Sequence, residues 1–74
     1  MPMQARDAVA ELVAMSGKSA IEVSREMGRA DTYVSMTISR RAVPKLDTFA
    51  ELAAACGYEV VLRGDGGEIA IEYR

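Results

Sequence analysis

The sequence predicts a mostly α-helical domain of four short helices followed by a two-stranded β-hairpin. Three observations support this fold class. Apolar residues recur at helical spacing as far as residue 57, glycines stand where the helical segments should end, and the spacing becomes alternating beyond residue 57. Because a chain of 74 residues holds one small domain, we expect a helical part at 1–57 and a hairpin at 58–74 within a single compact unit.

An amphipathic stripe and a capping motif predict the first two helices. The apolar and small residues between Met3 and Met15 fall on one helical face, at Ala5, Ala8, Val9, Leu12 and Val13. Ser19 and Glu22 then match a capping box, in which each side chain accepts a hydrogen bond from the other residue's backbone N–H. The second helix should run to Met27 and end at Gly28, because glycine readily adopts the left-handed conformation that stops a helix. Its expected core positions are Ile21, Val23 and Met27.

The third helix is expected at about residues 31–40. Asp31 suits its start, since the positive end of the helix dipole stabilises a carboxylate. Val34 and part of Ile38 should be buried. Met36 lies off that side of the helix and should face solvent.

A proline and a glycine bound the fourth helix. Val43 precedes Pro44 and is steered away from helical angles, so residues 40–44 predict a loop. The fourth helix should span about residues 45–56 and end at Gly57. Its expected inward positions are Leu46, Phe49, Leu52, Ala53 and Cys56.

Residues 58–74 predict an antiparallel hairpin with a glycine-rich turn at 64–67. A two-stranded hairpin is marginal in water by itself and leaves its edges unpaired. We therefore expect a two-fold symmetric homodimer, whose interface residues should be those on one face of the hairpin: Tyr58, Val60, Leu62, Ile69, Ile71 and Tyr73. The alternative is a monomer whose hairpin folds onto the first and fourth helices.

The charges are unevenly distributed along the chain. The net charge is −2 overall, but residues 16–46 carry +3 and residues 47–74 carry −4. A basic middle and an acidic C-terminal third indicate two surfaces with different roles, of which the basic one suits nucleic acid.

A helix, a glycine stop, two linking residues and a second short helix form the layout of a DNA-binding helix-turn-helix, whose second helix lies in the major groove. The segment 16–58, about 43 of the 74 residues, resembles the lambda-repressor-like, Cro-type (XRE) helix-turn-helix family without a gap in register. The resemblance rests on Ser16-Gly17-Lys18-Ser19, Val23-Ser24, Met27-Gly28, Val34-Ser35, Pro44-Lys45-Leu46-Asp47-Thr48-Phe49 and Leu52-Ala53-Ala54-Ala55-Cys56-Gly57.

Two departures from the family pattern concern phosphate contacts. Ala20 stands where many members have a glutamine that contacts a phosphate, although backbone N–H groups there could still bind one. Ile38-Ser39-Arg40 replaces the family's Glu-x-Gly at the end of the recognition helix. We infer a repacked helix end at which Arg40 and Arg41 supply phosphate contacts.

The resemblance implies that Asp31, Thr32 and Met36 contact bases, with Tyr33 and Ser35 at the margin. Asp31 suits a cytosine amino group, Thr32 offers a hydroxyl or a methyl group, and Met36 suits a thymine methyl group. Alternative roles are a helix cap for Asp31, a core position for Met36 and a solvated loop for Arg40 and Arg41. The phosphate contacts expected with this arrangement are Lys18, Ser19, Ser39, Arg40, Arg41 and Lys45.

These observations predict a sequence-specific double-stranded DNA-binding transcriptional regulator, of the phage-repressor or antitoxin-like kind. As a homodimer it should hold its two recognition helices about one turn of DNA apart. The alternative is a protein-binding adaptor that keeps the fold and holds a partner through its acidic hairpin. With no histidine and one cysteine, we expect no catalytic site, metal or cofactor. The chain lacks a long apolar stretch and a signal-peptide pattern, so we expect a cytoplasmic location away from membranes.

Overall fold

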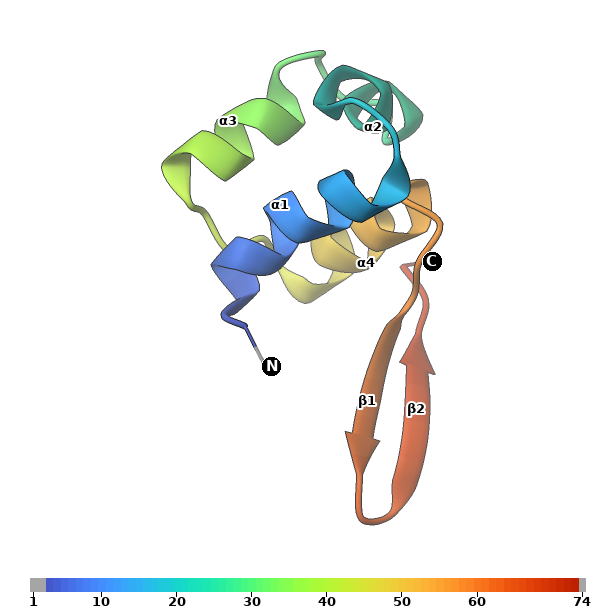
Figure 1. Cartoon of the computed structure of the whole chain (residues 1–74). Coiled ribbons are helices and arrows are strands. Elements are labelled where there is room, and N and C mark those ends of the chain that lie inside the picture. The colour runs from blue at the N-terminus through green and yellow to red at the C-terminus, as the bar shows by residue number, and fades with distance from the viewer. Residues whose placement is uncertain (1–2, 74) are drawn as a thin grey trace.

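The computed structural model describes residues 3–73 and confirms four helices followed by an antiparallel hairpin (Figure 1). The elements are α1 (Ala5–Ser16), α2 (Ala20–Glu26), α3 (Tyr33–Arg40), α4 (Leu46–Ala55), β1 (Val60–Gly64) and β2 (Gly67–Ile71). The helices form one body, and the hairpin extends from the side of α1 and α4, away from α3. None of the helices within residues 3–73 has both the length and the apolar character needed to cross a membrane.

The core is built by side chains from all four helices. Two predicted core positions are wrong, because Ile21 is 47% exposed and Leu46 is 55% exposed. Ile21 and Val23 lie about 160° apart around the axis of α2. Because Val23 faces the core, Ile21 faces solvent. Leu46 is the first residue of α4, where no described element covers it. The buried core cluster is Val9, Val23, Met27, Val34, Leu52 and Cys56.

The predicted helix ends are largely confirmed. Ser19 Oγ accepts a hydrogen bond from the Glu22 N–H at 3.1 Å, and Glu22 Oε1 accepts one from the Ser19 N–H at 3.0 Å, which completes the capping box. Gly28 and Gly57 follow α2 and α4 with φ of 70° and 84°. The predicted start of the third helix is wrong, because residues 31–32 form a turn and α3 begins at Tyr33.

The buried side chain of Ser24 explains this start. Ser24 Oγ accepts a hydrogen bond from the Val34 N–H at 3.1 Å and donates one to the Ala20 carbonyl oxygen at 2.8 Å. The first backbone N–H groups of a helix lack partners within the helix. A residue of α2 therefore caps α3, while Thr32 precedes α3 without a side-chain cap. This bond fixes the position of α3 relative to α2.

Replacing Ser24 by alanine should lower the free energy of unfolding by about 1–3 kcal/mol, since it leaves the Val34 N–H buried without its acceptor. Chemical denaturation followed by circular dichroism measures the change. Ser35→Ala is the matched control, because the Ser35 hydroxyl bonds the Thr32 carbonyl oxygen on the exposed side of α3. The control should stay within about 0.5 kcal/mol of the unchanged protein. Equal losses in the two variants would mean that Ser24 does not anchor α3.

The capping box also predicts a pH dependence of stability. Hydrogen bonds from the Ser19 backbone N–H and hydroxyl lower the pKa of Glu22. A carboxyl group with a lowered folded-state pKa stabilises the fold above its ordinary pKa of about 4.3 and loses this effect as the pH falls through the lower folded value. The temperature of thermal unfolding should therefore fall less steeply on acidification for Glu22→Gln than for the unchanged protein. Parallel curves would contradict this assignment.

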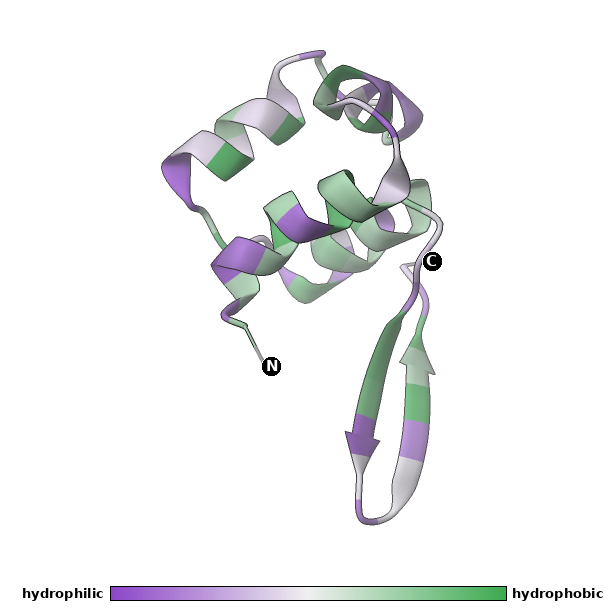
Figure 2. Ribbon diagram, viewed as in Figure 1, coloured by the Kyte–Doolittle hydropathy of each residue, from purple (hydrophilic) through white to green (hydrophobic). Residues whose placement is uncertain are grey.

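The hairpin projects from the helical body. Val60 pairs with Ile71 and Leu62 with Ile69, around a turn at Asp65 and Gly66. Every residue from 61 to 70 is exposed, so the alternative in which the hairpin folds onto the first and fourth helices is wrong. Figure 2 shows hydrophobic residues along both projecting strands.

Candidate nucleic-acid interface

The outward side of α3 is free of packing contacts with the rest of the body. Val34 is fully buried and Ile38 is half-buried, and together they hold the inner side. Because α3 lies at the opposite end of the molecule from the hairpin (Figure 1), nothing in residues 3–73 covers its outer side. The exposed residues on or beside this side are Thr32, Ser35, Met36, Ser39 and Arg40.

The structure brings most of the predicted base-contacting residues onto this surface. Thr32, Ser35 and Met36 are exposed, and Met36 is 43% exposed as predicted. Tyr33 is half-buried and packs against the core, while the Arg29 guanidinium lies 4.6 Å from the centre of its ring. Tyr33 is therefore the least available of the set.

Asp31 forms a fork-like pair with Arg25. The Arg25 Nε and Nη2 atoms donate to the two carboxylate oxygens, each at 2.9 Å. This hydrogen bonding lowers the pKa of Asp31 and keeps the carboxylate ionised. Asp31 consequently lies beside α3 with its charge offset by Arg25, and it does not cap the helix.

A shallow groove of about 330 Å³ runs along the outer side of α3. Arg29 and Arg40 line it together with apolar and hydroxyl groups, so it combines positive charge with surfaces suited to base edges. Its lining residues are Arg29, Ala30, Thr32, Tyr33, Met36, Thr37, Arg40 and Ala42.

Three of the predicted phosphate-contacting residues already have hydrogen-bond or ion-pair partners within the protein. Lys18 Nζ donates to Glu26 at 2.6 Å and to the Ala55 carbonyl oxygen at 2.9 Å, and Arg41 pairs with Asp7 at 3.1 Å. The Ser19 hydroxyl accepts the capping bond described above.

Three predicted phosphate-contacting residues, Ser39, Arg40 and Lys45, remain available. They are exposed, and no side-chain hydrogen bond or ion pair holds them within residues 3–73. Arg40 lies in the last turn of α3 and lines the groove, which makes it the best placed cation of the predicted set.

Two basic residues of this region were not predicted. Arg25 holds Asp31, and Arg29 pairs with Glu51 at 3.1 Å while lying over Tyr33. Neither arginine stands three or four residues from its acidic partner, because Asp31 lies across the α2–α3 turn and Glu51 lies on α4. The spacing in the sequence therefore did not indicate these ion pairs. The four-residue interval between Arg29 and Tyr33 is the one pattern that could have indicated a contact.

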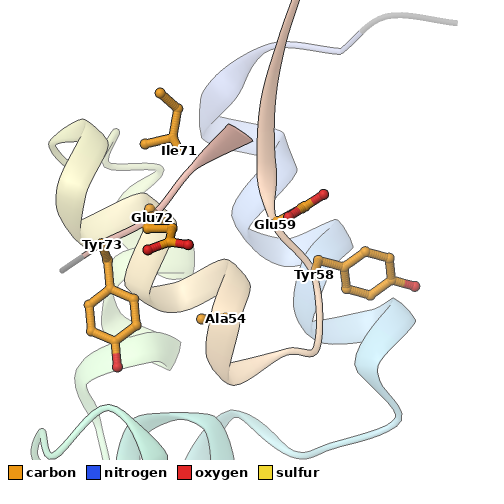
Figure 3. Close-up of a pocket in the computed structure, with 7 residues that line it drawn as sticks. Ala54, Tyr58, Glu59, Ile71, Glu72 and Tyr73 are labelled. Carbon is orange, nitrogen blue, oxygen red and sulfur yellow. The ribbon is translucent and has the colours of Figure 1, made fainter. Parts of the chain in front are cut away.

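The six predicted interface residues do not form a single surface. Val60, Leu62, Ile69 and Ile71 share one hairpin face by their pairing. The two tyrosines point in different directions at the base of the hairpin, as Figure 3 shows. A pocket of about 310 Å³ lies at this base, lined by Ala50, Ala54, Tyr58, Glu59, Ile71, Glu72 and Tyr73.

The cysteine and the acidic side chains of residues 3–73 do not come together in a catalytic or metal-binding cluster. Cys56 is buried, as predicted, and burial raises the pKa of its thiol, so it remains protonated at neutral pH. Within residues 3–73, no three Cys, Asp or Glu side chains are grouped so that they could hold a metal ion.

No protein-family model, curated protein or solved structure matches the chain.

Proposed function

We propose that this protein is a sequence-specific double-stranded DNA-binding regulator that uses α2 and α3 as a helix-turn-helix of the lambda-repressor-like kind. The observation that carries the proposal is that α3 has one packed side and one exposed side. Its inner side is packed and tethered through Ser24, while its outer side exposes polar, apolar and cationic groups over a shallow groove. A helix held in this way can enter the major groove as a rigid element.

The exposed groups suit different parts of the duplex. Thr32 and Met36 lie where base edges would be contacted, the former through its hydroxyl or methyl group and the latter against a thymine methyl group. Arg40 and Lys45 are free to contact phosphates, which position the protein without reading sequence. Since no arginine is committed to guanine in this arrangement, discrimination rests on hydroxyl and methyl contacts.

The ion pairs near α3 provide further cations. The pairs Arg25–Asp31 and Arg29–Glu51 are partly exposed at their side chains. Solvent-exposed ion pairs add little to stability, because water screens the two charges. A DNA phosphate can therefore replace a carboxylate as the partner of either arginine at little cost in stability.

Selection of bound fragments from random DNA tests the proposal. The protein should enrich a defined sequence, and Thr32→Ala should shift the preferred base at one position while total binding changes little. Ser35→Ala, in the first turn of α3 three residues after Thr32, is the comparison for a marginal position. Recovery of fragments without any sequence preference would overturn the proposal of sequence-specific recognition.

A protein-binding adaptor is the second candidate function. The projecting hairpin favours it, because its strands expose Leu62 and Ile69 and its charged residues are mostly acidic. An adaptor would keep the same fold and bind no DNA at low salt.

A further inference from the structure

The turn between α2 and α3 is held from two sides by adjacent residues of α2. On the buried side, the Ser24 hydroxyl accepts the Val34 N–H. On the exposed side, Arg25 Nε and Nη2 donate to the two carboxylate oxygens of Asp31, each at 2.9 Å. Asp31 therefore has a defined position just before α3, and the Arg25 guanidinium is fixed beside it.

The pair of Arg25 and Asp31 is open to solvent. The two side chains are 67% and 49% exposed, and neither has another side-chain hydrogen bond or ion pair within residues 3–73. Water screens an ion pair this exposed, so it adds little to stability. The pair can therefore contact a ligand without any change in the internal packing of the helices.

The pair presents hydrogen-bond donors and acceptors side by side. Asp31 occupies the guanidinium edge formed by Nε and Nη2, which leaves the Nη1 N–H groups and the second N–H of Nη2 to donate elsewhere. Hydrogen bonding to Arg25 lowers the pKa of Asp31, so its oxygens stay ionised and can only accept. Because the two charges cancel, a phosphate gains Arg25 only by displacing Asp31.

This arrangement matches the major-groove edge of a G·C base pair. Guanine presents N7 and O6 there as acceptors, and cytosine presents its N4 amino group as a donor. With Nη1 opposite N7 and Nη2 opposite O6, the carboxylate bonded to Nη2 lies on the cytosine side of Arg25. An A·T pair places the adenine amino group where guanine has O6, so a donor would face the donors of Arg25.

We infer that Arg25 contacts a guanine while Asp31 accepts from the cytosine of the same pair, so that the two residues read one G·C pair as a unit. The inference rests on the proposed function, because the N-terminal residues of a recognition helix lie at base edges. It adds a guanine contact from α2 to the hydroxyl and methyl contacts of α3. Each residue needs the other, since Asp31 orients Arg25, and Arg25 offsets the repulsion between Asp31 and the duplex.

Competition fluorescence anisotropy tests the inference, using the duplex recovered by selection and versions changed at one base pair at a time. The unchanged protein should prefer G·C at one position by about tenfold. Arg25→Ala should reduce this preference to about twofold or less and leave the preferences at other positions unchanged. Arg25→Lys should do the same, because an ammonium group does not form the fork. Asp31→Ala should also lose the preference, yet bind mixed DNA more tightly because a negative charge beside the duplex is removed.

Two further variants separate a reading unit from a solvated ion pair. The double variant Arg25→Ala/Asp31→Ala should lose no more preference than either single variant, because residues that act together are not additive. Arg63→Ala is the matched control, since it also removes the arginine of an exposed ion pair, here with Glu68 on the hairpin. It should leave every base preference unchanged. Circular dichroism should show the same helix content in all variants.

Survival of the G·C preference in Arg25→Ala would overturn the inference. A loss of affinity that is equal for all sequences would also overturn it, because it would show that a phosphate replaces Asp31 as the partner of Arg25. Sequence-specific binding would stand in both cases. Absence of any base preference in the unchanged protein would instead overturn the proposed function, and the inference with it.

Discussion

Replacing Leu52 by alanine is expected to reduce the free energy of unfolding by about 2–5 kcal/mol. Leu52 is 2% exposed and belongs to the cluster that joins all four helices. Truncating it removes apolar contacts and leaves a cavity that the surrounding helices fill only in part. A chain of this length has a total stability of roughly 4–11 kcal/mol, so the variant should be partly unfolded near body temperature.

Thermal and urea unfolding followed by circular dichroism measure this loss. Leu46→Ala removes the same atoms from the same helix at a position that is 55% exposed, and it should cost less than about 1 kcal/mol. Similar losses in the two variants would show that the core does not centre on Leu52.

Reversing the charge at Arg40 is expected to weaken DNA binding by at least about tenfold at low salt and to do so equally for all sequences. Arg40 is exposed, lines the groove on α3 and has no side-chain partner within residues 3–73. Arg40→Glu replaces a phosphate contact with repulsion, while Arg40→Ala should reduce the dependence of log affinity on log salt by about one. Fluorescence anisotropy with a labelled duplex measures both effects.

Arg63→Glu is the control for this prediction, since it makes the same change in net charge on the hairpin, at the opposite end of the molecule from α3. It should leave affinity within about twofold of the unchanged protein. If both variants lose affinity equally, net charge rather than contact at α3 determines binding. A loss confined to some sequences would mean that Arg40 contacts bases.

The sequence was sufficient to predict the elements because their signals are local. The capping box at Ser19 and the glycine stops at Gly28 and Gly57 each depend on a few neighbouring residues, and the structure confirms them. The alternating hairpin pattern gave the observed pairing for the same reason. Errors arose where tertiary packing decided the outcome. Ile21 fitted a helical stripe, yet only one side of the short α2 faces the body.

The candidate site was harder to predict because its side chains are held by distant partners. The capping of α3 by Ser24 joins residues ten positions apart, and no helical period indicates that contact. Lys18 looked available for phosphate, but Glu26 and the end of α4 engage it. Asp31 looked like a helix start and is instead paired with Arg25. Exposure of Met36 and Arg40 was predictable, since both lie off the buried side of one helix.

Titration of mixed genomic DNA at about 50 and 200 mM salt tests the central claim most directly. If α3 is the recognition helix of a DNA-binding regulator, the protein binds at the lower salt concentration, and its affinity falls steeply at the higher one as condensed counterions compete for the phosphates. Absence of binding at about 50 mM salt, with the helical fold intact by circular dichroism, would contradict the account and favour the adaptor.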